Sequence, residues 1–144
     1  MATQTTVRSG SENVILLAGR LALGAIFVES GLLKLTSLTA FAASLASRGV
    51  PQSSVWAVIG ATIEFGGGLL ILTGLRIRYA SLLMVLFVIV ATAISHRYWE
   101  FTGPNFRTQQ IQFFKNLSII GGFLLLYVTG GGRYSLDDWL RRKR

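Results

Sequence analysis

Ionisable and amide side chains lie inside long apolar stretches of this chain, where a helix that faces lipid would carry none. The candidates for a polar interior are Arg20, Lys34, Glu64, His96, Lys115 and Asn116. A charge at bilayer depth is costly, so it normally faces a bundle interior and has a partner there. His96 is the residue best suited to move a proton near neutral pH. We therefore expect a ligand-binding or buried polar cluster among these six residues, and the sequence assigns no catalytic role to any of them.

Arg20 and Glu64 are the two charges expected to meet inside the bundle. Arg20 lies about six residues from one end of its apolar stretch and Glu64 about ten, so antiparallel helices would offset their Cα atoms by roughly 6 Å. An arginine side chain covers that distance, which predicts an Arg20–Glu64 ion pair. The pair either fixes the register of two helices or anchors a quinone headgroup, an anion or a proton.

Four apolar runs predict four helices that span a membrane. They cover residues 14–35, 55–75, 80–98 and 111–129, each close to the ~20 residues that a bilayer requires. We expect a mobile N-terminal tail over 1–13 and a basic tail over 130–144 in which Ser135 and Asp138 have capping-box spacing. A short interfacial helix is expected within 36–54, closed by Gly49 and Pro51. The predicted fold is an all-α, integral membrane four-helix bundle.

Glycines and charges recur with helical spacing on three of these runs. The stripes are Arg20, Gly24, Phe27, Gly31 and Lys34; Gly60, Glu64, Gly67, Ile71 and Gly74; and Lys115, Ile119, Gly122, Leu126 and Thr129. Because small residues let helix backbones approach closely in membranes, these stripes are expected to meet at the bundle centre. Lys115 and Asn116 open the run 111–129, where a cation opposes the helix dipole, so Lys115 is expected to have a partner.

Composition narrows the class of protein. Half of the chain is hydrophobic (51%) and only 14% is charged, which favours a membrane protein. The net charge of +8 comes mainly from residues at the ends of apolar runs, so no nucleic-acid partner is expected. The chain has no cysteine and one histidine, which excludes thiol relays and predicts no metal site.

The distribution of basic residues predicts the orientation in the membrane. An even number of spans puts both termini on one side. Eight Lys and Arg residues flank the spans on that side, against five on the other. By the positive-inside rule both termini are expected to be cytoplasmic. The basic C-terminal tail is expected to contact anionic membrane lipid.

Several segments in a characteristic order resemble the DoxX family of small four-helix membrane proteins. They read GRLALGAIFVESGLLKL, GATIEFGGGLLILTGLRIRYASLL, ATAISH, FFKNLSIIGGFLLL and GGGRYSLDDW, and together they extend over about 17–139. The family includes relatives of a thiosulfate:quinone oxidoreductase subunit and members linked to membrane redox and thiol-stress complexes. The resemblance thus implies an inner-membrane location and a connection with redox chemistry.

The sequence leads to one functional prediction and one alternative. The prediction is a redox-associated subunit that binds a quinone-like or small anionic ligand in a polar bundle interior. The alternative is a non-enzymatic membrane scaffold or accessory protein. Quinone is the only candidate cofactor, and a membrane or peripheral redox protein is the candidate partner. Enzymatic activity and homo-oligomerisation are left open.

Overall fold

The chain folds into helices joined by short connections. The computed structural model describes residues 9–143, and its elements are α1 (Gly10–Thr36), α2 (Leu38–Ser47), α3 (Ser53–Thr73), α4 (Ile77–Ser95), the 3-10 helix η1 (Tyr98–Glu100), α5 (Pro104–Thr129) and α6 (Leu136–Arg142). Four stretches are long and apolar enough to cross a membrane: Gly10–Thr36, Ser53–Thr73, Ile77–Glu100 and Pro104–Thr129. The expected all-α fold with four spans is confirmed, and α2 is the short helix expected between the first two.

Two helices begin several residues before the apolar runs from which they were predicted. α1 begins at Gly10, inside the expected tail 1–13, because Ser9 and Glu12 form a capping box with bonds of 3.2 and 2.8 Å. Residues 1–8 of that tail lie outside the described part of the chain. α5 begins at Pro104 rather than at 111, with proline in the first turn, where its missing N–H costs nothing. Apolarity marks the part of a helix that faces lipid, and polar turns can extend the helix beyond it.

The start of α4 depends on a residue far away in the sequence. The Asp137 carboxylate accepts hydrogen bonds from the backbone N–H groups of Arg76 (2.8 Å) and Ile77 (2.9 Å). These donors are unsatisfied at any helix N-terminus, and an anion there is favoured by the helix dipole. This cap lets α4 begin at Ile77, three residues before the predicted start at 80, directly after the turn at Gly74.

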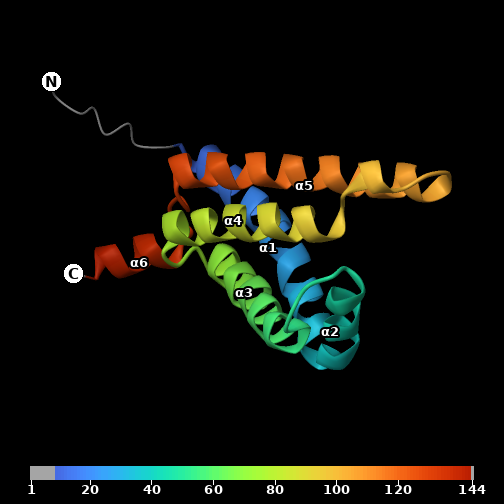
Figure 1. The fold of residues 1–144 in the computed structure, drawn as a ribbon. Coiled ribbons are helices and arrows are strands. Elements are labelled where there is room, and N and C mark those ends of the chain that lie inside the picture. Colours follow the sequence, from blue (N-terminus) through green and yellow to red (C-terminus); the bar gives the residue numbers. More distant parts are fainter. Residues whose placement is uncertain (1–8, 144) are drawn as a thin grey trace, which may run out of the picture.

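The spans form two hairpins. In the first hairpin α1 packs along α3, and α2 covers α3; in the second, α4 packs along α5. The hairpins contact each other mainly through α3 and α4. In Figure 1, α4 and α5 run alongside each other while α1 and α3 run obliquely towards α2. We call the end with the start of α1 and with α6 the terminal end, because Arg133 N–H donates to Asn13 Oδ1 there at 2.8 Å. The end with α2 and η1 is the far end.

Glycines bring α1 and α3 into backbone contact. A Cβ on Gly31 would lie 2.5 Å from Phe65 N, and one on Gly68 would lie 2.8 Å from Val28 N. The predicted faces do meet here, since Arg20, Gly24, Phe27 and Gly31 of α1 and Glu64, Gly67 and Ile71 of α3 are buried. Of the predicted α5 stripe only Leu126 is buried, and the other buried residue of this helix, Phe123, was not part of the stripe.

The apolar core joins the two hairpins near the middle of the bundle. Its members include Phe27, Ile71, Met84 and Phe123, and the ring centroids of Phe27 and Phe123 are 5.4 Å apart. Met84 belongs to a buried face of α4 that the sequence did not single out, which also includes Ile77, Ala80, Ser81, Val88 and Thr92. The core closes the bundle between its two ends and leaves room at the far end.

Candidate functional site

A cavity of about 610 Å³ lies between the two hairpins at the far end. Its walls come from α1, α2, α3, α4 and α5. Five of the six predicted polar residues line this inter-hairpin cavity: Lys34, Glu64, His96, Lys115 and Asn116. The rest of the lining is largely apolar and includes Phe27, Phe41 and Phe87. The walls of the cavity are therefore mainly apolar, and both hairpins contribute polar side chains to it.

Lys34 and Glu64 form the ion pair of the cavity. Lys34 Nζ lies 2.5 Å from Glu64 Oε2 and donates to Ser30 Oγ at 3.0 Å. The glutamate side chain is only 5% exposed, whereas that of Lys34 is 31% exposed. A buried carboxylate needs such a partner, because removing it from water costs several kcal/mol. The lysine thus neutralises Glu64 and still presents donor capacity to the cavity.

His96 ends α4 and is held by the N-terminal extension of α5. Its Nδ1 lies 2.8 Å from Oε1 of Gln109. In the neutral ring this contact puts the proton on Nδ1 and leaves Nε2 as an acceptor. Gln109 was not among the predicted polar residues, because it lies before the apolar run 111–129 in which the helix was expected. Its spacing from Asn116, seven residues or about two helical turns, would have placed both on one face of a longer helix.

Asn116 and Thr92 make a second polar link between α4 and α5. Asn116 Nδ2 donates to Thr92 Oγ1 at 2.8 Å, and that hydroxyl donates to the carbonyl of Val88 at 2.6 Å. Together with the His96–Gln109 contact, it fixes how the two helices of the second hairpin face each other. One wall of the cavity is therefore held in place by hydrogen bonds rather than by apolar contacts alone.

The prediction that Lys115 lies at the start of a helix, and therefore needs a partner against the helix dipole, is wrong. α5 begins at Pro104, so Lys115 lies in the middle of the helix and not in its first turn, and the conflict with the helix dipole disappears. Its Nζ donates to the side chain of Gln112 one turn earlier. Lys115 remains exposed at the cavity, where it adds a second cation to the Lys34 side chain.

Arg20 does not pair with Glu64 and does not line the cavity. Its guanidinium donates to the carbonyls of Leu72 (3.2 Å), Gly131 (2.8 Å) and Tyr134 (2.8 Å), and the residue is 2% exposed. The glycine contacts set a register in which Arg20 lies beside the C-terminal end of α3. Leu72 is about 12 Å further along that helix than Glu64. A cation is favourable at a helix C-terminus, where carbonyl groups lack intrahelical partners.

The fold and the polar far end define a small helical membrane protein with four spans and a cavity between two hairpins. The DoxX family model matches residues 15–97, so the chain belongs to the DoxX family. The match contains Arg20, Lys34, Glu64 and His96, whereas Lys115 and Asn116 lie beyond it.

Two relatives from Escherichia coli cover almost the whole chain. Inner membrane protein YphA is 36% identical over 86% of this chain and 89% of its own length. Inner membrane protein YqjF is 36% identical over 92% of this chain and 96% of its own length. A shorter similarity, 30% identity over 60% of this chain and 27% of the relative, links it to the yeast ER-derived vesicles protein ERV29. No solved structure gives a significant match. The chain is a multi-pass inner-membrane protein.

Proposed function

We propose that this protein is a redox-associated membrane subunit that binds a quinone-like ligand in the inter-hairpin cavity. The observation that carries the proposal is the combination of apolar walls with Lys34, His96, Lys115 and Asn116 in one cavity of about 610 Å³. That volume lies within the 300–1,000 Å³ typical of small-molecule sites. A ligand with a polar headgroup and an apolar tail matches both parts of the cavity.

The polar residues suit the oxygens of a quinone headgroup. Carbonyl oxygens accept hydrogen bonds, and the ammonium groups of Lys34 and Lys115 are donors with no acceptor capacity. Phe27, Phe41 and Phe87 line the cavity and offer apolar contact area for the ring and the start of its tail. A small anion would use the two lysines as well, but it would leave these apolar walls unused.

The chain's own part in redox chemistry would be to bind the headgroup and to exchange protons with it. Reduction of a quinone to a quinol takes up two electrons and two protons. The imidazolium form of His96, through Nε2, and the Lys34–Glu64 pair are the groups at the cavity able to give protons to the headgroup. Because the chain has no cysteine, the electrons would have to come from a partner protein. The redox connection itself rests on the family resemblance.

The test measures quinone binding by the full chain in nanodiscs. Trp56 lines the cavity, so a short-chain benzoquinone bound there should quench its fluorescence. We expect saturable quenching by the wild type and a Kd about tenfold or more weaker for Lys34→Gln, since a hydrogen bond from a charged group contributes about 1.5–3 kcal/mol. Glu64→Gln should also weaken binding, because it releases Lys34 from its present position.

Glu29→Gln is the matched control. Glu29 lies on the same helix as Lys34, is exposed and lies outside the cavity lining, so the substitution should leave Kd unchanged. Loss of quenching in the control as well would point to a general effect on α1. No saturable binding by the wild type, together with a stable protein partner that co-purifies with both wild type and Glu64→Gln, would replace the proposal by the scaffold alternative.

A further inference from the structure

A second cavity, of about 860 Å³, lies at the terminal end of the bundle. Its walls come from the start of α4, the connection after α5, α6 and Asn13 of α1. It is lined by five arginines, Arg76, Arg78, Arg133, Arg141 and Arg142, and by two carboxylates, Asp137 and Asp138, which leaves a net charge of +3. We call it the arginine pocket. It is separate from the inter-hairpin cavity and shares no residue with it.

Both carboxylates of the arginine pocket are already engaged. Asp137 caps the backbone N–H groups of Arg76 and Ile77. Asp138 accepts a hydrogen bond from Arg141, and its other oxygen lies 2.6 Å from Arg142 Nη2 in an ion pair without hydrogen-bond geometry. Burial raises the pKa of the Asp138 carboxyl, but the two arginines outweigh burial and hold this pKa below its ordinary value of 3.8. Asp138 therefore stays ionised and occupies the two arginines of α6.

Three arginines remain without a counter-charge. Within residues 9–143 the guanidinium groups of Arg76, Arg78 and Arg133 make no ion pair or hydrogen bond, and all three are exposed. They come from two different segments that the fold brings to one cavity. Unbalanced cations collected in a concave site favour an anionic ligand, and arginine matches the oxygens of phosphate in particular.

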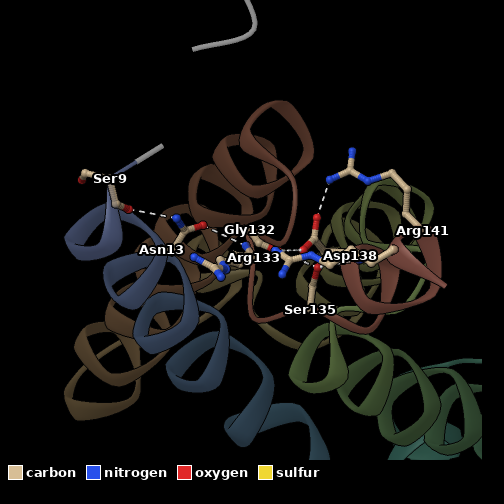
Figure 2. A network of polar contacts seen from close by, with 8 residues as sticks. Ser9, Asn13, Gly132, Arg133, Ser135, Asp138 and Arg141 are labelled. Atoms are coloured by element: carbon tan, nitrogen blue, oxygen red, sulfur yellow. Dashed lines mark hydrogen bonds and ion pairs between the residues drawn. The ribbon is translucent and has the colours of Figure 1, made fainter. Parts of the chain in front are cut away.

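The pocket is built by contacts that do not involve these three guanidinium groups. Asn13 Nδ2 donates to the carbonyl of Ser9 at 2.9 Å, and Asn13 Oδ1 accepts from the Arg133 N–H. On the opposite side, Ser135 Oγ donates to the carbonyl of Gly132 at 2.6 Å and accepts from the Asp138 N–H at 3.3 Å. Figure 2 shows this network running from Ser9 and Asn13 through Arg133 towards Asp138 and Arg141. These contacts within the chain hold the walls of the pocket in place and do not require a ligand.

Apolar and aromatic side chains beside the pocket indicate its depth in the membrane. Leu136, Trp139 and Leu140 of α6 are exposed although Asp138 on the same helix is buried. Tyr79, which lines the pocket, is exposed as well. An amphipathic helix with tryptophan and tyrosine beside it is typical of the level of the lipid headgroups. At that level the commonest anion is the phosphate of a phospholipid.

We propose that the arginine pocket binds the phosphate of an acidic phospholipid headgroup, with Arg76, Arg78 and Arg133 as its cationic partners. The occupant is a lipid rather than free phosphate because the exposed aromatic residue Tyr79 lines the pocket, and the exposed apolar side of α6, opposite its pocket-lining residues, places that helix at the level of the headgroups. The proposal is independent of the ligand in the inter-hairpin cavity.

The experiment titrates the full chain in phosphatidylcholine nanodiscs with fluorescent short-chain phosphatidylglycerol. The wild type should bind saturably, Arg133→Gln about tenfold more weakly, and Arg78→Gln/Arg133→Gln roughly 100-fold more weakly, because each substitution removes a charge-assisted hydrogen bond to the phosphate and not only an attraction to the membrane surface. Lys143→Gln removes one charge at the same end but outside the pocket lining, so it should change the Kd less than twofold. An equal loss in Lys143→Gln would show diffuse attraction to charge and overturn the proposal.

Two further measurements identify the ligand and control for folding. Inorganic phosphate should not compete at millimolar concentration. Binding of phosphate alone, lost in Arg133→Gln, with no preference for phosphatidylglycerol, would overturn the lipid assignment. If Arg133→Gln melts at a lower temperature than the wild type, Arg133→Lys must restore binding because it keeps the charge, and failure to do so would also contradict the proposal.

Discussion

Arg20 joins three pieces of main chain that are distant in the sequence. It lies on α1, and its guanidinium binds one carbonyl at the end of α3 and two in the connection before α6. The hydrogen bond to the Gly131 carbonyl is buried, and those to the Leu72 and Tyr134 carbonyls are partly buried. A side chain with five donors in a fixed fork is the natural one for this position, and Arg20 is accordingly a structural residue of the terminal end.

At this residue we predict a loss of stability for Arg20→Gln. The substitution leaves the buried Gly131 carbonyl without its donor, at a cost of about 1–3 kcal/mol, and loses two partly buried hydrogen bonds, so thermal unfolding in detergent should shift down by several degrees. Arg20→Lys should be intermediate, because one ammonium group cannot reach all three carbonyls. Lys143→Gln, an exposed cation at the same end, should melt like the wild type. Unchanged melting of Arg20→Gln with lost quinone binding would instead assign Arg20 to ligand binding.

At the scale of the elements, the register of α1 on α3 decides which charges meet. The helical spacing of Arg20, Gly24, Phe27 and Gly31 predicts their shared face, because a helix period is a local property of the sequence. The partner of Glu64 was not predictable in this way. It depends on backbone contacts such as Gly31 against Phe65, which place Lys34 rather than Arg20 beside Glu64. Arg20 and Lys34 lie about four helical turns apart on the same face of α1, and periodicity does not tell which of them is level with Glu64.

The early starts of α4 and α5 are a second case in which the sequence pattern was insufficient. Asp137 caps α4 from a position 60 residues later in the sequence, and Pro104 begins α5 within a polar segment. Neither feature changes the hydropathy of the chain, which is the signal from which the helix starts were predicted. The same extension of α5 supplies Gln109, the hydrogen-bond partner of His96. The missed helix start therefore concealed part of the candidate site.

For the helix pair α1–α3 we predict that Gly31→Ala destabilises the bundle. Its Cβ would lie 2.5 Å from Phe65 N and 2.7 Å from Phe65 Cα, so the backbones must separate. Overpacking of this kind costs about 1–3 kcal/mol, which should appear as a lower melting temperature. Gly19→Ala on the same helix meets nothing within 4 Å and should be neutral or slightly stabilising. A Gly31→Ala protein as stable as Gly19→Ala would contradict this tight packing of α1 on α3.

At the scale of the whole molecule, the two cavities lie at opposite ends of the bundle and differ in character. The inter-hairpin cavity is mainly apolar with a balanced ion pair, whereas the arginine pocket is strongly cationic. The core around Phe27, Ile71, Met84 and Phe123 separates them. If both proposals hold, the protein presents its quinone site to one side of the bilayer and its lipid-phosphate site to the other.

Which cavity faces the cytoplasm follows from the orientation of the chain, and both termini are predicted to be cytoplasmic. The absence of cysteine from the wild-type chain makes this prediction directly testable, because a single introduced cysteine is the only thiol. Thr102→Cys is exposed at the far end and Lys143→Cys is exposed at the terminal end. In intact bacterial cells with a permeable outer membrane, an impermeant maleimide should label Thr102→Cys at once and Lys143→Cys only after the inner membrane is opened. That result would put the arginine pocket on the inner leaflet, where acidic lipid and the Lys/Arg excess are expected to meet. The reverse labelling pattern would show that the termini are on the outer side of the membrane and that the inter-hairpin cavity faces the cytoplasm.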